Sequence, residues 1–266
     1  MRPHTLTSAL LSVSKLASSS SVASASTCPA RLLKPSSLLR ATTCNPTAST
    51  RLFSTSPSTS SSNMSASSST LLEAFKARRS FYQLNKELPI PSDKITSIVQ
   101  EALIQVPSSF NSQSNRVLVL YGAEHDKLWD ITSEVLKPIV PADSWESTAQ
   151  RNAGFKAAAG TVLFFVDNTV INGMQEKFAI YADRFPTWGE HSTAMLQFAT
   201  WTTLEAEGLG ANLQHYNPLI DQRVAKEWNI PSDWKLTAQL VFGGKGGEAG
   251  PKDHKPLEEI FKVAGA

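Results

Sequence analysis

The chain has 266 residues, and 25 Lys and Arg against 23 Asp and Glu give it a formal net charge of +2. The positive excess comes from residues 1–63, which contain basic but no acidic residues, so the remainder is mildly acidic and a nucleic-acid partner is not expected. Both cysteines, Cys28 and Cys44, lie in that same segment. Residues 64–266 therefore cannot contain a disulfide, a thiolate mechanism or a Cys-ligated metal.

Residues 1–63 have the composition of a transit peptide, with Arg and Lys scattered through Ser, Thr and Ala. The letters RLFS at residues 51–54 resemble a mitochondrial processing site, so mitochondrial import is expected. The alternative is a disordered Ser-rich tail. A second start at Met64 would make a cytoplasmic form without this leader. No apolar run approaches the roughly 20 residues of a membrane helix, so membrane insertion is not expected.

The chain from residue 64 onward, about 200 residues, is long enough for one domain with a sizeable core. Thr70 and Glu73 have the spacing of a capping box, which predicts a first helix from Thr70 through Arg78. Apolar residues at helical spacing predict a second helix over 92–105, which Pro107 ends. The β-forming run RVLVLYG at residues 116–122 then predicts a buried strand.

Helices and strands continue toward the C-terminus without strict alternation. Helical periodicity recurs at 124–137, 188–208 and 221–228, and a last helix is predicted to begin at Pro256. Strands are predicted at 160–167 (GTVLFFVD) and 236–244 (LTAQLVFGG). Few residues of 188–208 are charged, which predicts burial in a core or against another subunit. Three or four strands with about six helices indicate an α+β fold, helices around a small sheet.

Two basic segments are candidate anion sites. Arg78, Arg79 and Ser80 combine cationic groups with a hydroxyl at a helix end, which suits a phosphate. The alternative is a basic helix terminus that interacts favourably with the helix dipole. The glycine-rich segment 243–255 contains Lys252 and His254 but does not match a phosphate-loop motif. Taken alone, it predicts a flexible loop.

Two further segments are rich in hydrogen-bonding side chains. Residues 107–113 (PSSFNSQ) follow a helix, and their hydroxyls and amides suit a planar ligand or an ordinary turn. Residues 208–218 (GLGANLQHYNP) place five hydrogen-bonding side chains after the apolar helix. His191 and His215 are candidates for proton transfer, although a lone His is more often a structural polar group. HExxH, GxSxG and Cys-His patterns are absent, so hydrolytic and metal-dependent classes have no support.

The order and spacing of five stretches resemble the FMN-dependent nitroreductase family. They are RRSFYQL, PSSFNSQS, GTVLFF, GLGANLQHYNP and a Lys-containing segment before PLEE. The resemblance covers residues 70–262, and LQHYNP together with Ser114-Asn115 is similar to the branch of the yeast fatty-acid-repression nitroreductase-like proteins. It implies the nitroreductase-like fold, a small and mostly antiparallel sheet surrounded by helices. The helix at 188–208 would then be the core of a homodimer.

The resemblance also implies where FMN would bind. Arg78, Arg79 and Ser80 would hold its phosphate and ribityl end, joined by Lys252 and His254. The family commonly has Arg at the place of His254, and His is only partly charged near neutral pH, which weakens that assignment.

The flavin ring would contact three other groups of residues. Side chains from the opposite subunit would reach it, the segment after the long helix would run along its reactive edge, and one residue before the second strand would touch its pyrimidine edge. These groups are, in order, Ser108, Ser109, Asn111 and Gln113; Gln214, His215 and Tyr216; and Asn152 or Lys156. Phe110 or Tyr216 would stack on the acceptor, unless both simply pack.

The implied activity is alternating electron transfer. NADH or NADPH would pass a hydride to the flavin and leave, and a nitroaromatic, quinone or related acceptor would take the same place, which gives ping-pong kinetics. The flavin carries the chemistry, so no catalytic side chain and no metal are implied. The alternative is a flavin-binding regulatory or redox-sensing protein linked to lipid metabolism or oxidative stress, which needs the same FMN contacts.

Overall fold

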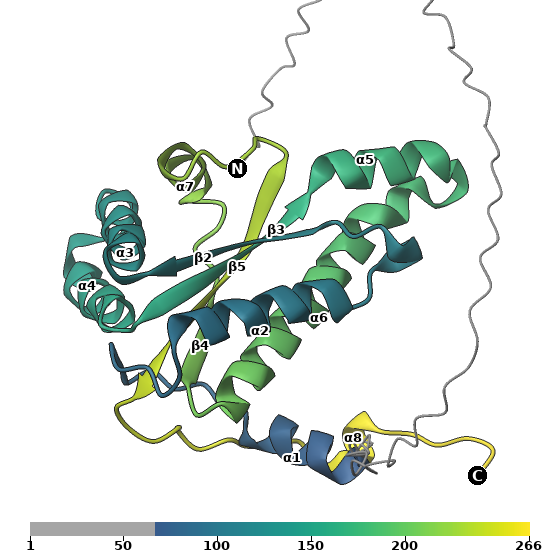
Figure 1. Cartoon of the computed structure of the whole chain (residues 1–266), viewed down its shortest axis with the longest axis horizontal. Coiled ribbons are helices and arrows are strands. Elements are labelled where there is room, and N and C mark those ends of the chain that lie inside the picture. Colours follow the sequence, from purple (N-terminus) through teal and green to yellow (C-terminus); the bar gives the residue numbers. More distant parts are fainter. Residues whose placement is uncertain (1–66) are drawn as a thin grey trace, which may run out of the picture. The chain divides into compact units, whose positions relative to one another are not determined.

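The computed structural model describes residues 67–266, so the expected leader and the expected start at Met64 lie outside the described residues. The elements in chain order are α1 (Ser68–Ala77), β1 (Leu84–Asn85), α2 (Ser92–Gln105), η1 (Ser109–Asn111), β2 (Asn115–Tyr121), α3 (Gly122–Leu136), α4 (Ala142–Lys156), β3 (Gly160–Asp167), α5 (Asn168–Lys177), η2 (Ala179–Arg184), α6 (Phe185–Ala206), β4 (Gly210–Gln214), α7 (Asp221–Glu227), β5 (Trp234–Lys245) and α8 (Leu257–Ile260). Figure 1 shows the strands between two groups of helices.

Strand β5 organises the sheet, because it pairs with three of the other strands. It runs antiparallel to β3 along one side, to β4 along the other and to β1 near its C-terminal end. Strand β2 extends the sheet beyond β3, again antiparallel. The parallel contact recorded among residues 67–266 is a single bridge between Ser80 and Ala211. The predicted α+β class with a small, mostly antiparallel sheet is therefore confirmed.

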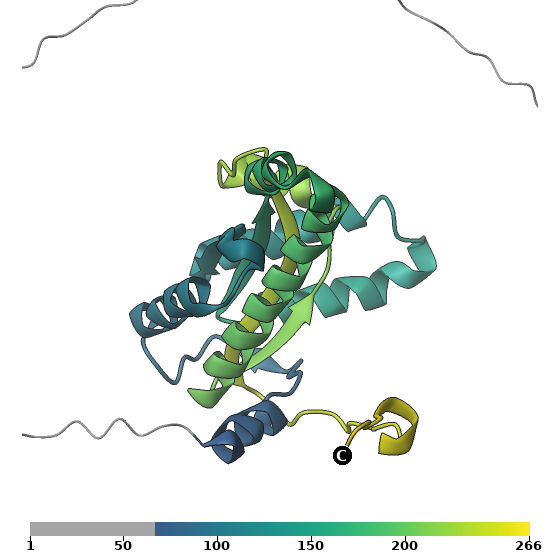
Figure 2. The ribbon, with the colours of Figure 1, turned by 90° about the vertical axis from the view of Figure 1, so that its right-hand side faces the viewer.

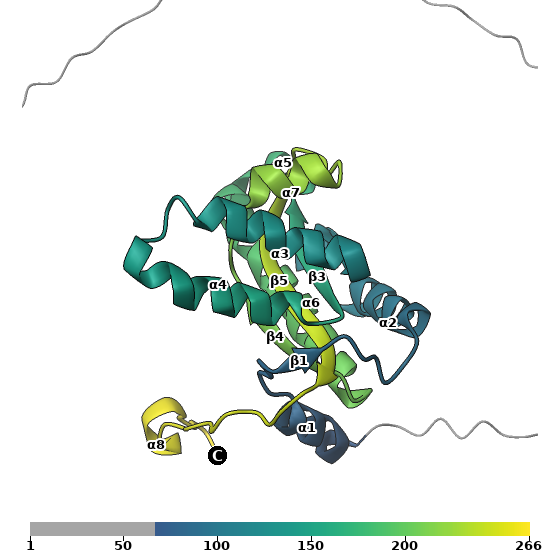
Figure 3. The ribbon, with the colours of Figure 1, turned by 90° about the vertical axis from the view of Figure 1, so that its left-hand side faces the viewer.

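Helices cover both faces of the sheet. Helices α3 and α4 lie over one face (Figure 3), and α2 and α6 lie over the other (Figure 2). Successive residues of β3 point to opposite faces, so Leu163 packs with Trp129 of α3, and Phe164 packs with Leu196 of α6. This double burial explains why residues 160–167 are apolar almost throughout rather than alternating with polar residues.

Helix α6, predicted to be buried in a core or against another subunit, is buried along one side in the single chain. Its buried side includes polar residues such as Ser192, Thr193 and Gln197 beside Leu196. Each of these polar groups is hydrogen-bonded. The Ser192 hydroxyl donates to the Trp188 carbonyl at 2.8 Å, whereas the Thr193 hydroxyl donates to the Asn115 side chain at 2.8 Å and the Gln197 amide to the Thr237 hydroxyl at 3.5 Å. On the other side, Met195 and Phe198 are 43% and 41% exposed in the single chain. No described helix is both long enough and apolar enough to cross a membrane.

Several predicted boundaries need correction. Helix α1 begins earlier than predicted, because Ser67 is its cap and accepts the Thr70 amide at 3.4 Å, so the capping box at Thr70 is wrong. Helix α4 was not predicted because it buries little apolar surface, chiefly Phe155. Helix α5, β1 and β4 were also missed. The described residues contain eight α-helices and five strands, more than predicted, whereas the bounds predicted for α2 and β3 are confirmed.

Candidate functional site

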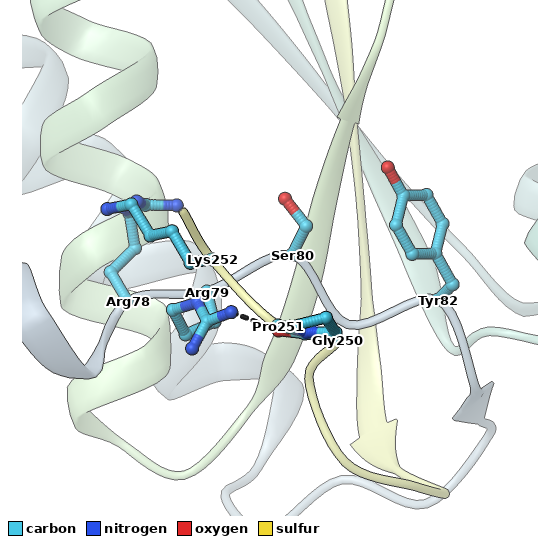
Figure 4. Close-up of a pocket in the computed structure, with 7 residues that line it drawn as sticks. All are labelled: Arg78, Arg79, Ser80, Tyr82, Gly250, Pro251 and Lys252. Carbon is cyan, nitrogen blue, oxygen red and sulfur yellow. Dashed lines mark hydrogen bonds between the residues drawn. The ribbon is translucent and has the colours of Figure 1, made fainter. Parts of the chain in front are cut away.

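A pocket of about 280 Å³ lies where the end of α1 meets the segment after β5 (Figure 4). Its lining comes from two stretches far apart in the sequence: Arg78, Arg79, Ser80 and Tyr82, and Gly250, Pro251 and Lys252. The Arg79 guanidinium donates a hydrogen bond to the Gly250 carbonyl, which ties the two stretches together. The structure thus brings together four of the five residues predicted for a phosphate. His254 is exposed and does not line the pocket.

The first stretch is held in place by β4. Helix α1 ends at Arg78, whose backbone is extended, and Ser80 then forms the parallel bridge with Ala211. The Phe81 amide donates to the Ala211 carbonyl at 3.0 Å, and the buried Asn212 side chain donates to the Phe81 carbonyl at 2.8 Å. Asn212 is therefore a structural amide that fixes the chain beside the two arginines.

The two cations of the pocket that are not tied to the chain are available to a ligand. The guanidinium carbon of Arg78 lies 4.5 Å from the ring centroid of Trp201, an arrangement that leaves its N–H groups free. Among residues 67–266, neither the Arg78 guanidinium nor the Lys252 ammonium has a hydrogen-bonding or ion-pair partner. Arg78 and Lys252 belong to the two different stretches of the lining, so an anion that contacted both would link those stretches.

A second pocket of about 280 Å³ gathers Ser108, Asn111 and Gln113. The backbone there is unusual, because Phe110, Asn111 and Gln113 have φ values of 57°, 50° and 52°, in the left-handed region. Non-glycine residues in that region cost on the order of 1 kcal/mol each and cluster at ligand sites. The Ser108 hydroxyl stabilises the turn by accepting the Gln113 amide at 2.8 Å. Ser109 begins the 3-10 turn and is half-buried.

Phe110 projects from this turn onto an aromatic cluster. Its ring centroid lies 4.8 Å from that of Phe178, 5.6 Å from that of Phe185 and 6.0 Å from that of Trp188. The side chain is nevertheless 54% exposed, so one part of it packs and another part is open to a ligand or a partner. The second pocket shares no lining residue with the first.

A third pocket of about 240 Å³ lies beside the segment that follows β4. His215 and Asn217 line it together with Thr193 and Gln197 of α6. The Gln214 side chain lies outside this lining and donates to Asn212 at 2.8 Å. The two α6 residues were not predicted as site residues. The available signal was two uncharged polar side chains one helical turn apart on a helix with few charged residues.

A model of the nitroreductase family matches residues 75–244. The chain belongs to the nitroreductase family. Two Saccharomyces cerevisiae proteins are similar over most of their length: HBN1 is 38% identical over 195 residues (72% of this chain, 97% of HBN1), and the nitroreductase FRM2 is 35% identical over 174 residues (65% and 86%). The predicted resemblance to this yeast branch is confirmed.

Solved nitroreductases share the fold. The nitroreductase CinD from Lactococcus lactis, in complex with nicotinic acid, is 45% identical, with a TM-score of 0.68 over 73% of this chain and 99% of CinD. The same enzyme was also solved with chloramphenicol and with 4-nitrophenol. A protein from Desulfovibrio desulfuricans, 19% identical with a TM-score of 0.54 over 73% of this chain and 96% of its own, was solved with FMN and shows the same fold.

In this member of the family, Tyr216 and Asn152, both predicted to contact ligands, are bonded to other side chains instead. The Tyr216 ring packs edge-on against Trp129, with centroids 5.7 Å apart, and its hydroxyl donates to Asn152 at 3.1 Å. Asn152 is 1% exposed and donates in turn to Ser133 at 3.1 Å. The structure therefore favours the packing alternative for the side chain of Tyr216, and it does not bring Asn152 to any of the three pockets.

Lys156 is likewise separate from the residues predicted to bind the phosphate. Its ammonium donates to both carboxylate oxygens of Asp130, at 2.6 and 2.7 Å, across the pair of helices α3 and α4. It lines none of the three pockets. The spacing before β3 could not distinguish a residue facing a ligand from one facing the neighbouring helix, because α4 itself was not predicted.

Proposed function

We propose that this member of the nitroreductase family is an FMN-dependent oxidoreductase, with NADH or NADPH as donor and nitroaromatic, quinone or related planar compounds as acceptors. The observation that carries the proposal is the pocket of Arg78, Arg79, Ser80 and Lys252. Two guanidinium groups, an ammonium and a hydroxyl make a donor set suited to a dianionic phosphate, because hydrogen bonds between charged partners are the strong ones. The residues present therefore fit the phosphate end of FMN.

The second and third pockets offer neutral donors and acceptors that suit a flavin ring, from Ser108, Asn111 and Gln113 in one and from Gln197 and Asn217 in the other. Each pocket also has one lining cation, but that cation is already paired: Arg116 with Asp167 at 2.8 Å, and Lys235 with Glu190 at 2.9 Å. When bound, FMN supplies the redox chemistry, accepting a hydride from a nicotinamide donor and giving electrons to an acceptor. The side chains of this protein would bind the cofactor, orient it and shape the space above its ring. A donor and an acceptor that share this space give ping-pong kinetics.

The acceptor class is supported by the relative CinD. Nicotinic acid and 4-nitrophenol, with which CinD was solved, are planar ring compounds, one a pyridine and the other a nitroaromatic. A site that holds both would suit a nicotinamide donor and a nitro acceptor in turn. In this chain, the exposed part of Phe110 is the aromatic surface proposed to contact the acceptor.

The proposed enzyme is a homodimer. Within one chain, the pocket lined by Ser108, Asn111 and Gln113 is separate from the pocket lined by Arg78 and Arg79. A second copy would therefore be needed to place both sets of residues beside one flavin. An apolar surface is available for that copy: Phe75 of α1 and Phe198 of α6 lie with ring centroids 5.0 Å apart, and Leu72 and Met195 are also exposed on these helices. Monomeric proteins rarely leave a large patch of this kind open to water.

We also propose that residues 1–63 direct the protein to mitochondria and that a start at Met64 yields a cytoplasmic form, on the composition given above. Terminal sequencing of protein isolated from each compartment tests this. A single terminus in both compartments would contradict it.

The test of the activity is an absorbance spectrum of the purified full chain, followed by NADH or NADPH in the absence of oxygen. The proposal predicts a yellow protein that bleaches with the donor and regains colour when a nitroaromatic or quinone is added. A yellow protein that does not bleach would favour the regulatory flavoprotein instead. A colourless protein that cannot take up FMN would contradict the proposal.

A further inference from the structure

Glu205, near the C-terminal end of α6, is a buried acid beside the cationic pocket. The residue is 7% exposed, and its carboxyl group makes two hydrogen bonds: Oε2 accepts from the Arg79 backbone amide at 2.8 Å, and Oε1 accepts from the Trp201 indole at 2.9 Å. The ring of Trp201 in turn lies against the Arg78 guanidinium, 4.5 Å from its centroid. One carboxyl group therefore contacts both arginines, one through its backbone and the other through Trp201.

The place of this acid is unfavourable unless it has a specific role. A carboxylate near a helix C-terminus is repelled by the helix dipole, and burial penalises its charge. Burial accordingly raises the pKa of Glu205, while the Arg79 amide, the Trp201 indole and the nearby Lys245 and Arg78 oppose that shift. An ionisable residue thus occupies a buried position where an apolar residue would normally lie.

The manner of contact is also informative, because Glu205 does not pair with the charged ends of the arginines. Among the residues that the structure describes, no ion pair joins Glu205 to the guanidinium of Arg78 or Arg79. An acid that formed such a pair would compete with a phosphate for the same donors. Glu205 instead fixes the Arg79 backbone and the Trp201 ring, and the guanidinium donors of Arg78 remain available.

We propose that Glu205 is a positioning residue that, through Arg79 and Trp201, holds the two arginines in the arrangement that binds the phosphate of the cofactor. The identity of that ligand rests on the function proposed above. The proposal makes a prediction opposite in sign to simple electrostatics. Removing a negative charge beside an anion site should strengthen anion binding, whereas removing a positioning group should weaken it.

The substitution Glu205→Gln separates these two effects. An amide keeps the size of the side chain but has one accepting oxygen, so its NH2 group must face either the Arg79 amide or the Trp201 indole, donor against donor. Glu207→Gln is the matched control. Glu207 is the neighbouring acid at the same helix end, and its carboxylate pairs with Lys94 rather than contacting Arg79 or Trp201.

The experiment measures binding of FMN and of riboflavin, which lacks the phosphate, to the full-length apoprotein by quenching of flavin fluorescence. We expect Glu205→Gln to weaken FMN binding about tenfold, the effect of one lost hydrogen bond to a charged group, and to leave riboflavin binding unchanged. Glu207→Gln should change neither. Tighter or unchanged FMN binding, or an equal loss for both flavins, would overturn the proposal.

A second readout does not depend on the flavin. Hydrogen exchange in the ligand-free protein should be at least several-fold faster at either the Arg79 amide or the Trp201 indole N–H in Glu205→Gln than in the wild type or in Glu207→Gln, because one of these two donors loses its acceptor. Unchanged rates at both positions would overturn the role of Glu205. If the wild type binds no FMN, the proposed function fails separately. Glu205 would then be judged by these rates together with the affinity for inorganic phosphate, which must fall in Glu205→Gln.

Discussion

Two polar clusters of this protein differ in whether their members satisfy one another. On the α3 and α4 side of the sheet, the polar side chains around His125 and Asn152 are bonded to neighbours of the same cluster. At the end of α1, Arg78 and Lys252 are cations without hydrogen-bonding or ion-pair partners among the described residues. The first cluster is called closed here: its buried donors and acceptors are paired, as is usual in folded proteins, and it needs only a structural explanation. The second is called open: Arg78 is partly buried and Lys252 is exposed, so both cations are solvated by water and remain accessible to a ligand.

In the cluster around His125, both ring nitrogens of the histidine have hydrogen-bond partners within the protein. Nε2 of His125 donates to the Phe155 carbonyl at 3.1 Å, because a carbonyl oxygen can only accept. Nδ1 of the neutral ring therefore accepts from the Thr161 hydroxyl at 2.8 Å, and that hydroxyl accepts in turn from the Trp129 indole at 3.2 Å. This chain uses the neutral form of the ring, and burial lowers the pKa of His125 from 6.5 to about 4.

The largest expected effect follows from that pKa. The unfolded chain binds a proton on His125 below pH 6.5 and the folded protein only below about 4, so the stabilisation is complete above 6.5 and is lost as pH falls through this window. The loss amounts to about 3 kcal/mol in the free energy of unfolding. Urea unfolding of the wild type and of His125→Gln across this range should show the added pH dependence in the wild type alone. Equal dependence in both proteins would contradict the closed arrangement.

Removal of an open-cluster cation should affect ligand binding rather than folding. Arg78→Ala is expected to weaken FMN retention by roughly 1–3 kcal/mol, the value of a hydrogen bond to a charged group, with little change in riboflavin affinity. Lys252→Met should act in the same direction and provides a comparison from the other side of the pocket. Equilibrium binding of both flavins tests this. Unchanged FMN affinity in Arg78→Ala would remove the phosphate assignment.

A smaller effect is expected in the closed cluster when Tyr216 loses its hydroxyl. Tyr216→Phe retains the ring against Trp129 but removes the bond to Asn152, which should cost about 1 kcal/mol of stability. The KM for a nitroaromatic acceptor should not change, because the ring packs inside the protein. A raised KM with unchanged stability would instead return Tyr216 to the acceptor site.

The smallest effect is expected at Lys156. Its pair with Asp130 is partly exposed, with side-chain exposures of 40% and 55%, and such pairs contribute less than about 1 kcal/mol. Lys156→Gln should therefore leave both the thermal midpoint and FMN affinity nearly unchanged. A clear loss of FMN affinity would show that Lys156 contacts the pyrimidine edge after all.

The same contrast explains what the sequence could and could not predict. Strand β3 and helix α2 were predicted with their bounds because burial on both faces, or on one helical stripe, leaves a strong apolar pattern. Strand β4 was missed because its polar residues resemble a binding loop, whereas Asn212 in fact anchors the chain at Phe81. Helix α4 was missed because it has almost no apolar stripe.

For the site, the family resemblance identified Arg78, Arg79, Ser80 and Lys252, whose meeting depends on the fold and cannot be read from spacing alone. The resemblance could not distinguish polar side chains that are bonded within the protein from those that are free to bind a ligand. Tyr216 and Lys156 were therefore predicted as ligand contacts together with the residues of the phosphate pocket. Glu205 was missed because acids at a helix end usually face solvent. The available signal was an acid directly after a long uncharged stretch of α6.

The most direct test of the central claim is a crystal structure of the full-length protein reconstituted with FMN. We predict density for the phosphate between Arg78 and Lys252, with Ser108, Asn111 or Gln113 of a second copy beside the flavin ring. A phosphate bound elsewhere, or a flavin contacted by one chain alone, would contradict the assignment of the open cluster and of the dimeric site.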